Sequence, residues 1–91
     1  MDAQERFIHD LDNVLHGIRS LLIEKNAKYG DSALDPVRIF SKASSAEQLR
    51  VRLDDKLSRL ARGTGEEDED ILMDTLGYLI MLRIANYRSL L

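Results

Sequence analysis

Asp74 is the residue whose chemistry fits its surroundings least. Its nearest apolar neighbours are Ile71, Leu72, Met73 and Leu76. A carboxylate in such a setting needs a cation, a metal ion or several hydrogen-bond donors. Two interpretations follow: a buried ion pair with an arginine of the second helix, or a metal or ligand site. Asp70 lies one helical turn before Asp74 and Tyr78 one turn after it.

A second cluster is strongly basic. Its members are Arg52, Asp55, Lys56, Arg59 and Arg62. Their spacings of three, four and seven residues place them on one face of a helix. An ordinary Asp55–Arg59 surface pair would contribute only a few tenths of a kcal/mol. Four cations against one acid are poorly neutralised, so a bound phosphate or a neighbouring acidic segment would balance them.

A third cluster lies where the first helix should end. It brings together Lys25, Asn26, Lys28 and Tyr29 just before Gly30. Asn26 and Tyr29 are suited to reading a nucleobase by hydrogen bonding and stacking, while a lysine meets phosphate. Helix ends also collect lysine, asparagine and glycine for purely structural reasons.

Several kinds of chemistry find no support in the residues. The chain has no cysteine, which excludes disulfides, thiolate nucleophiles and zinc ribbons. His9 and His16 are seven residues apart, too far for both to hold one metal ion. No Ser/His/Asp arrangement and no glycine-rich phosphate or dinucleotide motif is present.

The composition favours a compact anionic ligand over duplex nucleic acid. The chain has 91 residues and a net charge of −3, and it suits one domain over residues 1–91. Its bases are concentrated in the middle, where Arg38, Lys42, Arg50 and the basic cluster outnumber Glu47, Asp54 and Asp55. Duplex binding needs a wider basic surface. No signal peptide or membrane span is visible, so we expect a cytoplasmic protein.

Three helices should position these clusters, at about residues 3–28, 45–62 and 67–89. Phe7, Leu11, Val14 and Ile18 recur at steps of four and three, the pattern of an amphipathic helix. Leu49, Leu53, Leu57 and Leu60 form the apolar line of the second helix. Gly30 and Gly63 are placed to end the first and second helices. The fold class is therefore all-α.

Two local signals refine the middle of the chain. Asp35 followed by Pro36 predicts an N-cap and a short helical turn near residues 36–40. Ser44 and Glu47 have the spacing of a capping box, which predicts the start of the second helix.

The third helix is apolar nearly all round from Leu76 to Ala85. Helices of this kind are buried on every side. Two other helices of this length do not surround it easily, so we expect an oligomeric helical bundle.

Taken together, the clusters resemble the nucleotide modification associated domain family, small proteins common in phage genomes. That family is similar to the MazG-like, all-α NTP pyrophosphohydrolases. The resemblance covers roughly residues 24–85 and rests on the ordered segments 25–32, 38–42, 51–59 and 70–78. Its most telling motifs are Asp-Asp-Lys-x-x-Arg ending at Arg59 and Asp-x-x-x-Asp-x-x-Gly-Tyr ending at Tyr78.

The resemblance implies an all-helical oligomer with a nucleotide pocket between helices. The implied ligand-binding residues are Lys25, Asn26, Lys28, Tyr29, Arg38, Phe40, Lys42, Arg52, Asp55, Lys56, Arg59, Asp74 and Tyr78. MazG-like enzymes bind Mg²⁺ through a Glu-x-x-Glu pair and a Glu-x-x-Asp pair. Here the carboxylates available for Mg²⁺ are Asp55, Asp70 and Asp74. Arg52 stands three residues before Asp55, where the family pattern has a carboxylate, and an arginine there favours direct contact with phosphate.

Three functions remain open from the sequence. The first is a phage sponge-like protein that captures a phosphorylated nucleotide, cyclic or signalling, without cleaving it. The second is a Mg²⁺-dependent nucleoside triphosphate pyrophosphohydrolase with a reduced carboxylate set. The third is a purely structural helical oligomer, which explains the apolar core and leaves Asp74 and the basic cluster unexplained. We favour capture, because the Glu-x-x-Glu pair is missing.

Overall fold

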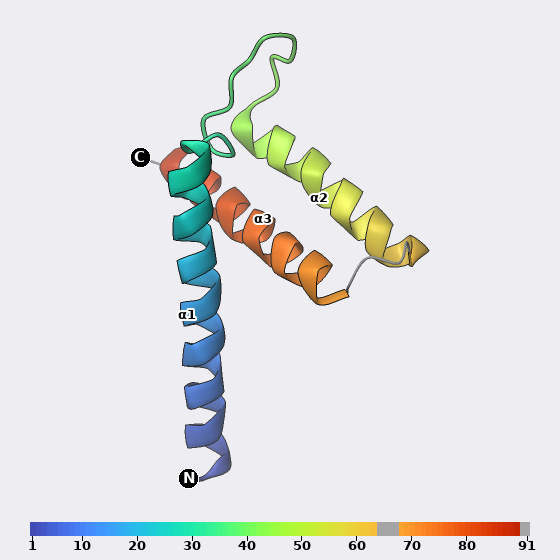
Figure 1. The fold of residues 1–91 in the computed structure, drawn as a ribbon. Helices are drawn as coiled ribbons and strands as arrows, with labels where there is room; N and C mark the ends of the chain where they lie inside the picture. Colours follow the sequence, from blue (N-terminus) through green and yellow to red (C-terminus); the bar gives the residue numbers. More distant parts are fainter. Residues whose placement is uncertain (64–67, 90–91) are drawn as a thin grey trace. The chain divides into compact units, whose positions relative to one another are not determined.

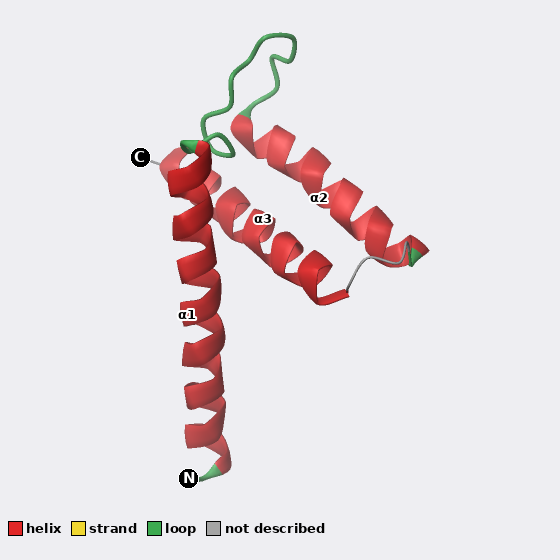
Figure 2. Cartoon of the chain, in the orientation of Figure 1, coloured by secondary structure: helices red, strands yellow, loops and turns green. Residues whose placement is uncertain are grey.

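Three helices make up the fold in the computed structural model (Figure 1). It describes the backbone of residues 1–63 and 68–89, and the same side chains apart from those of residues 68–70. The helices are α1 (Ala3–Tyr29), α2 (Ser45–Arg62) and α3 (Asp68–Ser89). No strand occurs in the ranges described (Figure 2). The predicted all-α class and the three helices are confirmed.

The chain forms two compact units, residues 1–30 and residues 31–91, and each is described by itself. The first is α1 with its caps. The second contains the loop of residues 31–44 and the helices α2 and α3. Within the described residues, no helix combines the length and the apolar character needed to cross a membrane.

Local capping explains where α1 begins and ends. Asp2 is the N-cap, and its Oδ1 accepts a hydrogen bond of 2.8 Å from the Glu5 N–H. Gly30 adopts the left-handed conformation, with φ at 63°, and its N–H donates to the Asn26 carbonyl. The predicted role of Gly30 is confirmed.

The first half of α1 leaves its apolar side chains in solvent. Phe7, Leu11 and Val14 lie on one face of the helix and are all exposed, together with Ile8 and Leu15 beside them. Ile18, further along the same face, is buried. The amphipathic pattern therefore produces an open apolar stripe in this half of the helix.

α2 begins and ends as the sequence predicts. Ser44 is the N-cap, and its Oγ accepts a hydrogen bond of 3.1 Å from the Glu47 N–H. The Glu47 carboxylate pairs with Arg50 at 3.3 Å. Gly63 ends the helix in the left-handed conformation, with φ at 61°.

The core of the second unit lies between α2 and α3, which are side by side and run in opposite directions (Figure 1). Leu49 and Leu53 of α2 and Ile71 of α3 are buried. The Thr75 hydroxyl is also buried and donates to the Ile71 carbonyl at 2.7 Å, so its burial leaves no unmet hydrogen bond. Leu57 was predicted on the apolar line of α2, but it is half exposed because it lies at the edge of the buried face.

The prediction of a short helical turn near residues 36–40 is wrong, because these residues are not helical. The turn lies earlier, at residues 31–34, where the N–H groups of Leu34 and Asp35 both donate to the Asp31 carbonyl. Asp35 is thereby used to close this turn and does not cap a following one. The next residues include Val37 and Ile39, whose β-branched side chains disfavour helix. A single turn does not offset the cost of helix nucleation.

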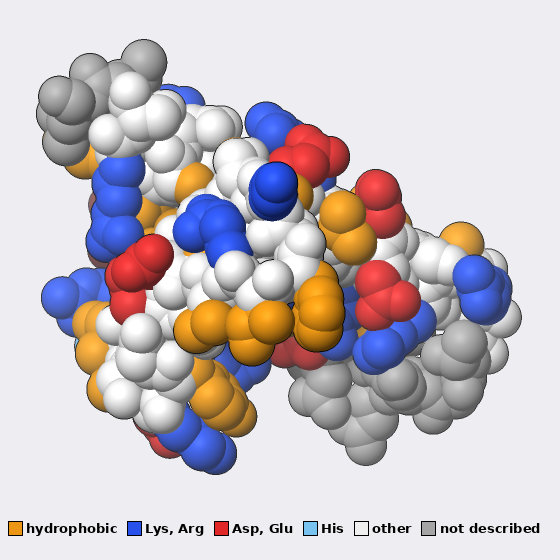
Figure 3. Space-filling view, turned by 90° about the horizontal axis from the view of Figure 1, so that it is seen from above, with side chains coloured by type: hydrophobic (Ala, Val, Ile, Leu, Met, Phe, Trp, Pro, Cys, Tyr) orange, Lys and Arg blue, Asp and Glu red, His pale blue; other side chains and the backbone are white. Residues whose placement is uncertain are grey.

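α3 is not buried on every side in this chain. Ile71 and Thr75 are buried, while Leu72, Leu76 and Leu79 reach solvent. Figure 3 shows hydrophobic side chains at the surface among charged ones. An oligomeric bundle that covers this face stays a prediction.

Candidate functional site: the basic face of α2

The four cations predicted on one face of α2 lie beside its buried face. Lys56 is half-buried, Arg59 is less so, and Arg52 and Arg62 are exposed. We call Arg52, Lys56, Arg59 and Arg62 the basic face of α2. The face takes this position because its residues follow the buried Leu49–Leu53 line around the helix.

Lys56 pairs with Asp74 across the α2–α3 interface. The Lys56 Nζ and the Asp74 Oδ2 lie 3.1 Å apart, with 15% and 32% of the two side chains exposed. Lys56 therefore supplies a cation to the Asp74 carboxylate. An arginine was expected in this role. Such a pair neutralises a carboxylate that would be costly to leave alone in this position.

Asp55 pairs with Arg59 along the same helix. The Arg59 Nη2 and the Asp55 Oδ2 lie 3.1 Å apart, the i,i+4 pair that the sequence allows. Both side chains are more than one third exposed, so the pair adds little to stability. Its consequence is geometric: it holds the Arg59 guanidinium close to the helix surface.

Arg52 and Arg62 differ from Lys56 and Arg59 in their ion pairing. Neither of them makes an ion pair within the described part of the chain. Both are exposed. Arg50, on another side of the same helix, is held by Glu47 at 3.3 Å. The basic face therefore carries positive charge that the described carboxylates leave unbalanced.

Tyr78 and Asp70 flank Asp74 on α3. Tyr78 is half-buried, one turn after Asp74. The side chain of Asp70 lies outside the described residues. Among the described side chains, no three carboxylate, imidazole or thiol groups come together to hold a metal ion.

Arg38 organises the loop of residues 31–44, which precedes α2. Its Nε donates to the Ala43 carbonyl at 3.1 Å, its Nη2 to the Ser45 Oγ at 3.0 Å and its Nη1 to the Pro36 carbonyl at 3.5 Å. Gln48 donates to the same Ala43 carbonyl at 3.0 Å. Arg38 was predicted among the ligand-binding residues, and here its donors fasten the loop to the first turn of α2.

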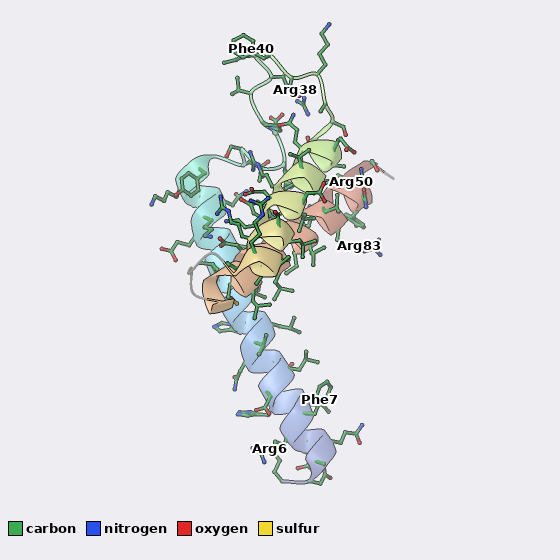
Figure 4. All side chains as sticks on the ribbon, turned by 90° about the vertical axis from the view of Figure 1, so that its right-hand side faces the viewer. Arg6, Phe7, Arg38, Phe40, Arg50 and Arg83 are labelled. Carbon is green, nitrogen blue, oxygen red and sulfur yellow. The ribbon has the colours of Figure 1, made fainter. Side chains whose placement is uncertain are left out.

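The same loop carries apolar side chains into solvent. Phe40 is 97% exposed, and Figure 4 shows it at the outer end of the loop. Val37, Ile39 and Lys42 are also exposed. Phe40 therefore stands apart from the Lys56–Asp74 pair, although it was predicted in one site with it, and Lys42 lies on the same loop.

The cluster at the end of α1 forms a local arrangement of its own. The Lys28 Nζ lies 5.3 Å from the centre of the Tyr29 ring, within the range of a cation–π contact. Tyr29 is exposed, as are Lys25, Asn26 and Lys28. Lys25 and Asn26 also have polar or electrostatic interactions within the molecule.

The chain matches no protein-family model, no curated protein and no solved structure.

Two residues bear on the site although the predicted ligand set omitted them. Arg62 belongs to the basic face by spacing and is exposed, yet it was left out of the predicted ligand set. Ser45 anchors the Arg38 guanidinium and was seen only as the start of a helix. A signal for Arg62 existed, since it lies seven residues after Asp55 and three after Arg59.

Proposed function

We propose that this chain binds a phosphorylated nucleotide and that the basic face of α2 holds its phosphates. One observation carries the proposal: Arg52 and Arg62 are exposed and make no ion pair among the described residues, on the same face as Lys56 and Arg59. Positive charge that the described carboxylates leave unbalanced on an exposed helix face attracts an anion.

Arginine is the appropriate residue for this ligand. Its planar guanidinium donates two parallel hydrogen bonds to the oxygens of one phosphate. Arg52 and Arg59 are seven residues apart, about 10 Å along the helix axis at the usual rise. The Arg59 guanidinium has N–H donors besides the one paired with Asp55, so Arg52 and Arg59 can meet successive phosphates of one polyphosphate chain.

The pairing of Asp74 with Lys56 supports capture over hydrolysis. A Mg²⁺ ion needs several hard oxygen ligands that carry net negative charge. Asp74 has a lysine ammonium at 3.1 Å, and Asp55 has a guanidinium at 3.1 Å. Both carboxylates would have to leave their cations to hold a metal ion. We therefore propose a sponge-like role, in which the ligand is bound and released unchanged.

Asn26 and Tyr29 were predicted from their residue types to read a nucleobase, and they belong to the unit of residues 1–30, apart from the unit that carries the basic face of α2. The exposed Tyr29 ring can stack on a base, as aromatic side chains do in single-stranded nucleic-acid sites. The resemblance to small phage proteins also suggests a host signalling nucleotide as the ligand class.

The test uses a panel of mononucleotides, dinucleotides, cyclic nucleotides and nucleoside triphosphates, with and without Mg²⁺. Calorimetry would measure affinity, and chromatography after denaturation would identify what the protein held. Intact nucleotide recovered from the protein supports capture. Pyrophosphate and monophosphate released in the presence of Mg²⁺ would show hydrolysis and reject the sponge role.

Arg52→Ala and Arg50→Ala form a matched pair for the same test. We expect Arg52→Ala to weaken binding by about 1.5–3 kcal/mol, the range for a hydrogen bond to a charged group. Arg50→Ala should leave binding unchanged, since this guanidinium is held by Glu47 away from the basic face. Equal losses in the two variants would mean that only overall charge matters and would reject the site.

A further inference from the structure

The same chain carries two open apolar stripes, one in each unit. On α1 the stripe is Phe7, Leu11 and Val14, and Phe7 is 64% exposed. On α3 it is Leu72, Leu76 and Leu79, and Leu79 is 50% exposed. We call them the α1 stripe and the α3 stripe. In each the spacing is three or four residues, so the side chains form a continuous ridge along one face.

The charges along the two helices are opposite in order. The first half of α1 is acidic, with Glu5, Asp10 and Asp12 against Arg6, and its second half is basic, with Arg19, Lys25 and Lys28 against Glu24. α3 begins with the acids of residues 68–70. After Asp74 its only charges are Arg83 and Arg88.

If α1 and α3 lie antiparallel, opposite charges therefore meet at both ends of the pair. The acidic start of α1 would lie beside the basic end of α3, and the basic end of α1 beside the acidic start of α3. A parallel alignment would place like charges together at both ends. Complementary charges of this kind select orientation and partner more than they add affinity.

We propose that the two stripes bind each other between two copies of this chain. The α1 stripe of one copy packs antiparallel on the α3 stripe of the second copy, and the second copy does the same in return. Each chain holds one stripe of each kind, so two copies related by a two-fold axis can satisfy both stripes of both chains, and a closed dimer is the assembly that we propose. The proposal is independent of nucleotide binding.

The stripe spacings fit more than one antiparallel register, and the charges of Asp10 and Arg83 favour one of them. With Leu11 opposite Leu79, antiparallel packing brings Val14 opposite Leu76. Phe7 then lies opposite Arg83, which Figure 4 labels on α3. Asp10, one turn from Phe7, is the acid placed to meet the Arg83 guanidinium.

Cysteine cross-linking tests both the partner and the register, because the natural chain has no cysteine. Leu11→Cys and Leu79→Cys are made in separate chains, mixed, and oxidised mildly. Both positions are at least 40% exposed, so each variant should fold with the helical content of the unaltered chain. We expect a mixed disulfide between the two variants in more than half of the chains, since the register brings the two Cα atoms within bonding range.

Leu11→Cys mixed with Leu72→Cys is the matched control. In the proposed register position 72 lies about two turns from position 11, so little mixed disulfide should form. A dominant disulfide between two Leu11→Cys chains would mean that α1 pairs with itself and would overturn the proposal. A chain that sediments as a monomer at 100 μM, with no mixed disulfide, would overturn it as well.

Charge reversal gives a second, independent readout. We expect Arg83→Glu to raise the dimer dissociation constant about fivefold, typical of an exposed ion pair. Adding Asp10→Arg in the same chain should restore most of the affinity, whereas Arg50→Glu on α2 should leave it unchanged. Failure of Asp10→Arg to restore dimerisation, with both variants folded, would reject the register.

Discussion

The Lys56 ammonium lies 3.1 Å from the Asp74 carboxylate, and this pair joins α2 to α3 beside the buried core. Lys56 is the more enclosed partner, with 15% of its side chain exposed against 32% for Asp74. The pair connects the carboxylate that the sequence marked as anomalous to the basic face of α2. It also sets the charge that is left on that face for a ligand.

We expect Asp74→Asn to lower the free energy of unfolding by about 1–2 kcal/mol, because it leaves the half-buried Lys56 charge without its carboxylate. Asp55→Asn is the control and should cost less than about 0.5 kcal/mol, since the Asp55–Arg59 pair is exposed. Urea denaturation followed by circular dichroism measures both. Equal losses would show that the Lys56–Asp74 pair contributes no more to stability than the exposed Asp55–Arg59 pair.

Replacing both partners at once separates the pair from its charges. Lys56→Met with Asp74→Leu removes both charges and leaves neither one alone. We expect this double variant to be more stable than Asp74→Asn, because apolar replacements of a buried pair are often neutral or better. A double variant less stable than the single one would mean that the carboxylate makes other essential bonds.

Removing divalent cations should leave most of the nucleotide affinity in place. The basic face contacts phosphate directly in our proposal, and the two carboxylates beside it already have cations at 3.1 Å. Titration calorimetry in excess chelator would measure the affinity, with added Mg²⁺ as the comparison. Binding that is lost in chelator and restored by Mg²⁺ would favour the pyrophosphohydrolase instead.

Arg38→Ala should loosen the loop of residues 31–44 without unfolding the helices. The change removes three hydrogen bonds to Pro36, Ala43 and Ser45. Limited proteolysis should then cut near the exposed Phe40 at least several times faster than in the unaltered chain. Lys42→Ala, in the same loop, serves as the control and should leave the rate unchanged.

Two glycines should respond to alanine with opposite signs. Gly63 has φ at 61°, so Gly63→Ala should cost about 1 kcal/mol of stability. Gly17 lies inside α1, and a Cβ there would meet no atom within 4 Å. Gly17→Ala should therefore raise stability by about 0.5–1 kcal/mol, the helix propensity difference. Thermal melting compares the two variants, and a stabilising Gly63→Ala would contradict the left-handed cap.

The elements of this fold could be predicted because their signals are local. Ser44 and Gly63 bound α2, and Gly30 follows α1, since caps satisfy backbone groups within a few residues of the helix end. The helical turn predicted near residues 36–40 is absent because of other local interactions. Asp35 and Pro36 are a proper start signal, but the preceding turn at Asp31 and the side chain of Arg38 use the nearby backbone groups.

The sequence predicted which residues make up the candidate site, and it predicted only some of the ion pairs among them. The spacing of Arg52, Lys56 and Arg59 depends on helical periodicity, so the basic face followed from the sequence. The partner of Asp74 did not, because three cations of α2 have similar spacing. The rotation of α2 against α3 brings Lys56 into reach and leaves Arg52 exposed.

The sequence by itself therefore determined the three helices, the caps at Gly30, Ser44 and Gly63, and the grouping of charge on one face of α2. Each of these depends on interactions within about one helical turn. Only the tertiary structure decided which cation meets Asp74, which leucines of α2 and α3 are buried and that Arg38 holds its own loop. These outcomes depend on how two helices pack and how one side chain spans a loop. The contacts between α2 and α3 join residues far apart in the chain, and the Arg38 bonds span a loop that has no regular periodicity, so no local pattern specifies either.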